Sequence, residues 1–182
     1  AHRRIEREHR LFKILGADSK YITDTLYPAV SLLYSQDEQG SMKMRCTATA
    51  IEFKNGITTF VTAAHCACED NADKKTVSPP KDAVLYLTSD NPDDKEFERA
   101  TIVGCGYRHK GDDFLLLSVK SKKTYPIVKL GNDPELLETV VNVASPLGLG
   151  KQAFLGSVSS PSLERPVVVD DINWDHAVML QL

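Results

Sequence analysis

Two kinds of side chain in this sequence combine proton chemistry with a position at the edge of a predicted strand. The first is His65, which follows the apolar run 57–61 and a pair of alanines. The β-branched residues of this run predict a strand, and residues 63–67 predict a short helical turn after it. His65 therefore lies at the rim of a sheet, where an imidazole that exchanges protons near neutral pH meets solvent and substrate.

The second is a carboxylic acid, Asp112 or Asp113, directly before the apolar run 114–119. A carboxylate beside a buried strand is costly unless its charge has a partner. Either both acids close a surface turn, or one of them pairs with His65, which precedes Asp113 by 48 residues.

Residues 62–66 read Thr-Ala-Ala-His-Cys, and they resemble the histidine motif of trypsin-like (chymotrypsin-fold) serine proteases. The segment that begins at Asp113 resembles the stretch of that family whose aspartate orients the histidine, with Leu115 where a smaller residue is usual. The resemblance implies that His65 is the general base and that Asp113 orients it, whereas Asp112 lies one residue off. It also implies cleavage of protein or peptide substrates, with no cofactor and no metal.

Residues 140–160 are similar to the HtrA (DegP-like) branch of that family, in which a strand runs into a glycine-rich turn and then a Gly-x-Val-Ser strand. Ser145 departs from the residues usual in the turn. The sequence has no Ile-Val-Gly-Gly start, so the resemblance is to members that need no activation by cleavage there. It covers residues 29–182 and leaves out the first helix.

The family's nucleophile is the serine of a Gly-x-Ser-Gly segment, just after the strand that residues 177–182 resemble. The sequence ends at Leu182, so no nucleophile is assigned within it. The run 156–160 (Gly-Ser-Val-Ser-Ser) lacks the second glycine of a Gly-x-Ser-x-Gly motif, and we interpret it as a strand. Taken literally, the chain is not expected to be a working peptidase, because the chemistry also needs the serine and an oxyanion hole.

Three hypotheses for function remain. In the first, the chain carries the histidine and aspartate of a serine endopeptidase whose serine lies beyond Leu182. In the second, it is a non-catalytic trypsin-like pseudoprotease, a module that binds peptide or protein through the same groove. In the third, it is a structural component of a larger assembly and docks through its charged, amphipathic first helix.

The four cysteines, Cys46, Cys66, Cys68 and Cys105, allow three disulfide pairings. One alternative is four reduced thiols in a cytosolic protein. Another is a metal site that includes His65, although Cys-x-Cys lacks the paired spacing of a common zinc site. The resemblance implies a bond between Cys46 and Cys66, which leaves Cys68 and Cys105 for a second bond. Disulfides imply an oxidising compartment, so we expect an extracytoplasmic or secreted protein.

Length and charge limit the classes of partner. With 182 residues, 42% of them hydrophobic, the chain can form one large domain or two small lobes around a sizeable core. A formal net charge of -3 gives no reason to expect nucleic acid or an anionic membrane as a partner. No apolar run approaches the roughly 20 residues needed to span a bilayer.

Many short strands between turn residues, with ten glycines and nine prolines, predict an all-β fold. The resemblance makes this two six-stranded antiparallel β-barrels, preceded by an N-terminal helix. We expect the helix within 1–20, the first barrel, with His65 and Asp113, within 21–125, and an incomplete second barrel within 126–182.

An Asn-Gly pair at 55–56 predicts a tight hairpin turn between two of these strands, because both central residues need positive φ. The helix is predicted over 1–17 and a surface loop over 69–81. Strands are predicted at 27–34, 42–53, 57–61, 83–88, 99–105, 114–119, 140–144, 152–160, 167–172 and 177–182.

Only the last four of these strands belong to the second barrel. Four strands would form only an open half of the second barrel. The apolar interior and the unpaired edges of this half-barrel would be exposed to water. We therefore expect a C-terminal continuation or a second chain to supply the missing strands.

Overall fold

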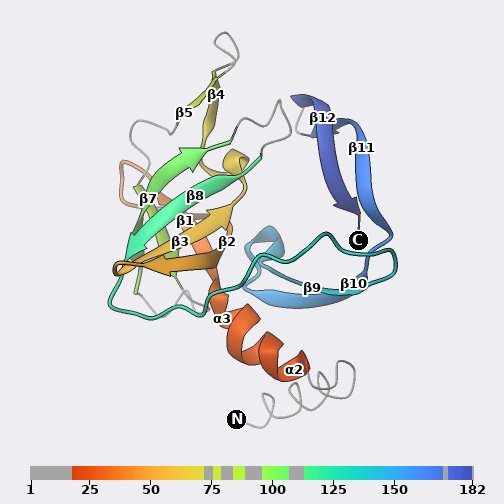
Figure 1. Cartoon of the computed structure of the whole chain (residues 1–182). Coiled ribbons are helices and arrows are strands. Elements are labelled where there is room, and N and C mark those ends of the chain that lie inside the picture. The colour runs from red at the N-terminus through yellow and green to blue at the C-terminus, as the bar shows by residue number, and fades with distance from the viewer. Residues whose placement is uncertain are drawn as a thin grey trace.

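The computed structural model describes residues 18–71, 76–78, 84–88, 96–106, 113–169 and 172–181. The helix predicted over 1–17 lies outside these ranges. The described residues form a helical segment, a closed β-barrel and three two-stranded sheets (Figure 1). None of their helices is both long enough and apolar enough to cross a membrane.

Six antiparallel strands close into a barrel in the order β1-β2-β3-β8-β7-β6, and β6 pairs back onto β1. The predicted first barrel of six antiparallel strands is therefore confirmed. Closure gives every strand a hydrogen-bonded neighbour on both sides, so the barrel has no open edge. The strands are β1 (Val30–Gln36), β2 (Met42–Lys54), β3 (Ile57–Thr62), β6 (Val84–Thr88), β7 (Glu98–Cys105) and β8 (Leu115–Lys120).

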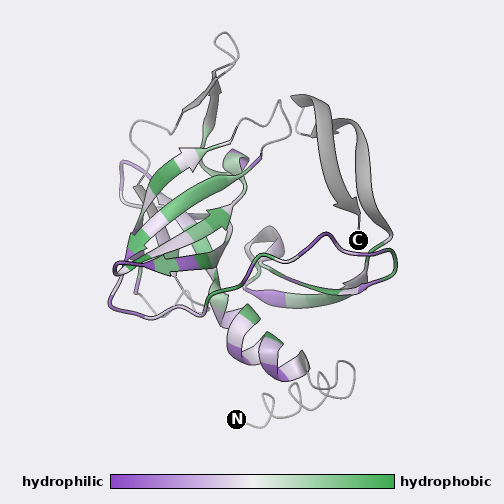
Figure 2. Cartoon of the chain, in the orientation of Figure 1, coloured by the Kyte–Doolittle hydropathy of each residue, from purple (hydrophilic) through white to green (hydrophobic). Residues whose placement is uncertain are grey.

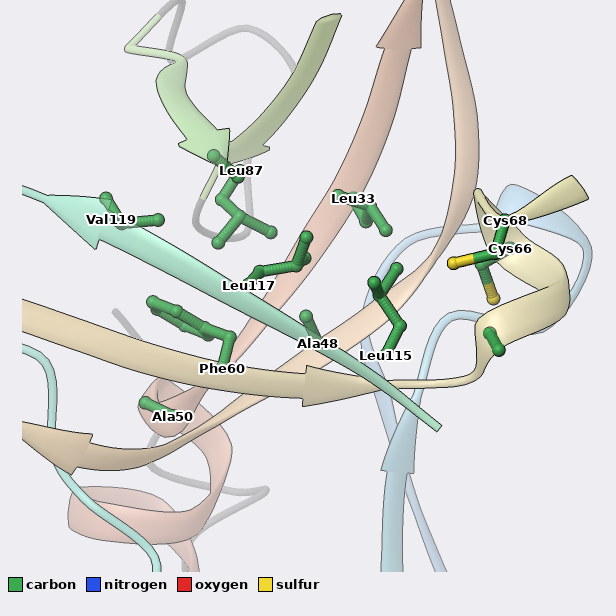
Figure 3. Close-up of a cluster of buried hydrophobic side chains, with 12 residues drawn as sticks. Leu33, Ala48, Ala50, Phe60, Cys66, Cys68, Leu87, Leu115, Leu117 and Val119 are labelled. Carbon is green, nitrogen blue, oxygen red and sulfur yellow. The ribbon is translucent and has the colours of Figure 1, made fainter. Parts of the chain in front are cut away.

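Apolar side chains from all six strands fill the barrel, and apolar residues run along these strands in Figure 2. On β8 the alternate residues Leu115, Leu117 and Val119 are buried, as the two-residue period of a strand requires. Figure 3 shows them converging with Phe60 of β3 and Leu87 of β6. Burial of these side chains is the main force that closes the barrel.

The hairpin between β2 and β3 turns at the predicted Asn-Gly pair. Asn55 has φ 53° and Gly56 has φ 76°, and Lys54 pairs with Ile57 across the turn. Positive φ at both central residues gives a turn whose twist matches the twist of the flanking strands. The predicted hairpin is confirmed.

The chain enters the barrel through a helical segment, α2 (Asp18–Tyr21), a π-helical turn (Ile22–Leu26) and α3 (Tyr27–Ala29). The strand prediction over 27–34 is wrong in its first three residues, because β1 begins at Val30. Pro28 lies in the first turn of α3, where a missing N–H group costs little.

Lys151, just before β10 (Gln152–Ser157), contacts the end of this helical segment. It is a buried lysine, only 8% exposed. Its ammonium group donates to the carbonyl oxygen of Tyr27 and, at 2.7 Å, to that of Val30. It also lies 4.3 Å from the centre of the Tyr27 ring, whose hydroxyl donates to the Lys151 carbonyl at 2.8 Å. We call this contact the Tyr27–Lys151 clasp; it places a cation at a helix C-terminus, where the carbonyl groups attract positive charge.

The predicted surface loop over 69–81 contains a small hairpin, which corrects that prediction. β4 (Glu69–Asn71) pairs antiparallel with β5 (Thr76–Ser78), directly after Cys68. The hairpin extends away from the barrel (Figure 1). Its sequence is short and polar, so it lacks the alternation of apolar residues from which strands are predicted.

The connection from the barrel to the second half is fixed along the barrel. The hydroxyl groups of Ser121 and Tyr125 both donate to the carboxylate of Glu98 on β7. The Tyr125 ring packs edge-on against Phe60, with ring centroids 5.0 Å apart. Both contacts tie the connection to the barrel wall.

Two further contacts hold the same connection. The ammonium group of Lys123 hydrogen-bonds to the Glu96 carboxylate, and this bond and its positive charge hold the pKa of Glu96 below its ordinary value. The N–H group of Val128 donates to the carbonyl oxygen of Ala50 at 3.0 Å. The start of the second half is therefore placed by the barrel.

The described part of the second half forms two separate two-stranded sheets, and no second closed barrel is present among these residues. β9 (Thr139–Ala144) pairs with β10, and the turn between them contains the short helix Pro146–Gly148. β11 (Ser160–Val169) pairs with β12 (Ile172–Gln181).

The predicted strands of the second half need correction in their extent. The strand predicted over 152–160 is divided, because β10 ends at Ser157 and β11 begins at Ser160. The strands predicted over 167–172 and 177–182 belong to the long hairpin of β11 and β12. Between β10 and β11, the Val158 N–H group donates to the Glu138 carbonyl oxygen at 2.9 Å. The local sequence does not predict this tertiary hydrogen bond.

We expect Gly56→Ala to lower the free energy of unfolding by about 1–2 kcal/mol, the cost of placing a Cβ atom at this positive φ. The measurement is urea denaturation of the full chain. Gly131→Ala is the control, because an added Cβ atom there meets no atom within 4 Å and its φ is not positive. Equal effects of the two substitutions would contradict the prediction.

We expect Lys151→Met to destabilise the chain by about 1–3 kcal/mol, because the buried carbonyl oxygens of the Tyr27–Lys151 clasp lose a charged donor. Methionine keeps most of the length of the apolar stem, so packing changes little. Lys129→Met is the control, since Lys129 is exposed. Thermal unfolding of both variants checks the expectation, which fails if their midpoints coincide.

Candidate active site

The pairing of β3 with β8 brings His65 and Asp113 together. In its register Thr62, the last residue of β3, lies opposite Leu115, the first residue of β8. His65 comes three residues after Thr62, and Asp113 comes two residues before Leu115. Both side chains therefore lie just beyond the same end of the barrel.

A single 3₁₀ turn, Ala64–Cys66, presents His65. The N–H group of Cys68 donates to the carbonyl oxygen of Ala64 at 2.8 Å and closes the turn. Ala64 and Cys66 are buried in the core cluster of the barrel. The turn is thus anchored by small buried residues, while the imidazole between them stays exposed.

Asp113 accepts two hydrogen bonds from His65. Its Oδ1 atom lies 3.0 Å from the backbone nitrogen of His65, and its Oδ2 atom lies 2.6 Å from the ring nitrogen Nδ1. The His65 side chain is 46% exposed and that of Asp113 only 17%. We call this pair the His65–Asp113 dyad; it fixes the ring with one edge on the carboxylate and the other directed away from it.

The dyad also sets the tautomer of the neutral ring. An ionised carboxylate only accepts hydrogen bonds, so the facing Nδ1 atom carries the proton. The Nε2 atom then presents its lone pair and can take a proton from another group. This is the arrangement that a general base requires.

The sequence left two acids as candidates for the partner of His65. The structure brings Asp113 to His65, as the resemblance implied. Asp112 lies outside the described residues.

Two disulfides flank the dyad. Cys46 on β2 is bonded to Cys66, with Cα atoms 6.1 Å apart, as the resemblance implied. Cys68 is bonded to Cys105 at the end of β7, with Cα atoms 6.4 Å apart. His65 therefore lies on a turn that is tied to two different strands.

Thr62 also belongs to the site, although the sequence analysis assigned it no role. Its hydroxyl group donates to the carbonyl oxygen of Thr47 on β2 at 2.7 Å. The same hydroxyl lies 3.9 Å from the sulfur of Cys66. Its position within the motif at 62–66 was the available signal.

A metal site built on His65 does not fit the geometry. Ligand atoms of His65, Cys46 and Cys66 lie within 4.8 Å of one another. However, both sulfurs are used in the disulfide, and a metal binds the thiolate form of cysteine. The Nδ1 atom of His65 also faces Asp113.

The interpretation of the serine-rich run 156–160 as a strand is confirmed in part. The run begins in the last residues of β10, which ends at Ser157, and it reaches the first residue of β11. Ser157 pairs with Thr139 across the β9–β10 hairpin. No turn from strand to helix follows it, because β11 begins at Ser160. The run therefore lacks the backbone context of a Gly-x-Ser-x-Gly nucleophile.

No family model and no curated protein sequence matches the chain. Among solved structures, the HtrA-type protease AlgW with a decapeptide matches with a TM-score of 0.60 and 12% identity, over 90% of this chain and 51% of that one. The active form of the Rv3671c protease from M. tuberculosis matches with a TM-score of 0.57 and 17% identity, over 87% and 59%. A serine endoprotease from Yersinia pestis matches with a TM-score of 0.55 and 14% identity, over 90% and 53%.

The chain shares the backbone fold of these proteases over part of their length. It spans about half the length of these neighbours, 51%, 59% and 53% respectively. At identities of 12–17% the likeness concerns the course of the backbone. The chemistry of His65 and Asp113 is therefore argued from their own geometry.

We expect Asp113→Asn to invert the tautomer of the neutral His65 ring. The backbone N–H group of His65 can only donate, so it retains the amide oxygen and leaves the amide NH₂ facing Nδ1. The Nδ1 atom must then accept, and the ring proton moves to Nε2. The ¹⁵N chemical shifts of the ring nitrogens report this change, and Asp133→Asn, an exposed acid elsewhere, is the control. An Nδ1-protonated ring in the Asp113→Asn chain would contradict the assignment.

Proposed function

We propose that this chain carries the histidine and aspartate of a trypsin-like serine endopeptidase, whose nucleophilic serine belongs to polypeptide beyond Leu182. The observation that carries the proposal is the double hydrogen bond from His65 to Asp113. A carboxylate that holds both the backbone and the ring of one histidine orients that ring, and the exposed Nε2 edge is then open to a nucleophile. The likeness to the HtrA-type protease AlgW and to the other two proteases supports this at the level of the fold.

In the proposed reaction the Nε2 atom of His65 takes the serine proton while the serine oxygen attacks the peptide carbonyl. The same atom then returns the proton to the leaving amine. The Asp113 carboxylate keeps the ring in the reactive orientation and stabilises the imidazolium between the two steps. Backbone N–H groups near the serine stabilise the negative charge on the tetrahedral intermediate.

The second half supports the further proposal that more polypeptide completes it. A two-stranded hairpin by itself is only marginally stable in water. In addition, the second half exposes large apolar side chains, including Leu137 and Leu149, each 73% exposed. Added strands from a C-terminal continuation or a second chain would cover these residues and form the second barrel.

Two other features support a proposal for the substrate class and for the compartment. The AlgW neighbour is a complex with a decapeptide, which supports a peptide or protein substrate for this chain as well. The two disulfides support an oxidising location, outside the cytoplasm.

The test uses the parent protein with the polypeptide that continues past Leu182, and a fluorophosphonate probe that labels activated serines. We expect covalent labelling of one serine in a Gly-x-Ser-Gly segment. His65→Ala should abolish labelling, and Asp113→Asn should slow it by roughly 10⁴-fold, because the ring presents the wrong tautomer. Asp133→Asn should label at the rate of the unchanged protein.

Each result of this experiment separates the hypotheses. A folded parent protein that is not labelled but binds peptide would replace the proposal with a pseudoprotease. A folded protein that neither labels nor binds peptide would favour a structural component of an assembly. Labelling that persists in His65→Ala would remove His65 from the mechanism.

A further inference from the structure

The second disulfide joins the segment after the His65 turn to β7, a neighbour of β8, which is the strand that Asp113 precedes. Leu115 lies opposite Thr62 of β3 on one side and opposite Cys105 of β7 on the other. Cys68 follows the turn that continues β3. The Cys68–Cys105 bond therefore passes from the turn bearing His65 to the far neighbour of β8, at the end of the barrel where Asp113 lies.

A β-bulge makes this bond possible. On β7, Ile102 lies opposite Leu117 and Gly104 opposite Leu116, so Val103 is the extra residue, and it is 62% exposed. Ile102 and Cys105 both pack against the barrel core although they are three positions apart in the sequence. Regular alternation would direct Cys105 to the opposite face from Ile102, so the bulge turns its sulfur toward Cys68.

A hydrogen bond transmits the position of Cys105 to the neighbourhood of Asp113. The N–H group of Gly106 donates to the carbonyl oxygen of Phe114 at 2.7 Å. Gly106 follows Cys105, and Phe114 follows Asp113. This hydrogen bond therefore links the end of β7 to the start of β8 at this point.

The dyad needs such support because it lies at the surface. With the His65 side chain 46% exposed, water competes for both hydrogen bonds to Asp113. The turn that carries His65 is only three residues long. The Cys46–Cys66 bond ties it to β2, but that bond does not reach the strand beside Asp113.

We propose that the Cys68–Cys105 disulfide is a positioning strap, which fixes the His65 turn against the segment that bears Asp113 and so maintains the His65–Asp113 dyad. Cys68 and Cys105 are positioning residues in this proposal, since neither touches the reacting atoms. The geometric part of the inference stands on the contacts described above. Its consequence for peptide hydrolysis rests on the proposed function.

The test measures hydrogen exchange of the His65 amide by NMR in the full 182-residue chain. This amide donates to Asp113, so its protection reports the dyad directly. In Cys68→Ala/Cys105→Ala, where Cys46–Cys66 remains, we expect its exchange to be faster by about tenfold or more, equivalent to about 1.4 kcal/mol. Asp113→Ala sets the limit for complete loss of the bond.

Two controls separate the strap from general stability. The Leu117 amide in the middle of β8 reports the barrel and should change less than the His65 amide. Gly56→Ala weakens the barrel from the opposite end of β3 and should not accelerate His65 exchange more than Leu117 exchange. Unchanged His65 exchange in the double variant, or a change no larger than that of Leu117, would overturn the proposal.

If the alanine pair does not fold, Cys68→Ala/Cys105→Val fills more of the vacated volume, and the same comparison decides. In the complete protein, loss of the strap should lower kcat and leave KM unchanged, because the dyad acts on the chemical step. A fall in His65 protection in a parent protein without peptidase activity would keep the strap and remove the proposed function. Full kcat together with lost protection would show that catalysis does not depend on the strap.

Discussion

The register between β3 and β8 is the constraint on which the barrel and the candidate site both depend. Because side chains alternate along a strand, a slip of one residue would turn Leu115, Leu117 and Val119 from the core toward solvent. The same slip would move Asp113 by about 3.3 Å along the strand relative to His65, beyond hydrogen-bonding reach. The burial of apolar side chains therefore specifies the geometry of two polar ones.

The site is assembled from local anchors placed on this register. Small residues of the turn, such as Ala64, pack into the core, and the disulfides tie the turn to β2 and β7. The polar atoms then have little freedom, although water reaches the imidazole. Rigid support of a partly exposed pair is what precise positioning of a reactive group requires. The β9–β10 hairpin shows the reverse, because Phe154 and Leu155 on β10 are 43% and 49% exposed.

Features with a local cause could be predicted from the sequence. The Asn55–Gly56 turn follows from backbone sterics, and the alternation on β8 follows from its apolar residues. The pairing of His65 with Asp113 needed a resemblance, because no local rule connects residues 48 positions apart. Features with a distant cause were missed. Tyr27 is helical where an apolar run indicated a strand, and its partner Lys151 lies 124 residues away. The bulge at Val103 likewise depends on the neighbouring strand.

The order of the strands along the chain also has a consequence for synthesis on the ribosome. Every strand of the closed barrel, and all four cysteines, lie between Val30 and Lys120. All residues of this barrel are thus translated before Lys151, which at about 5–20 residues per second follows Lys120 by seconds. The segment that ends at Ala29 differs, because Lys151 must be made before the clasp can close. The helical segment that ends at Ala29 is therefore translated before the barrel but secured after it.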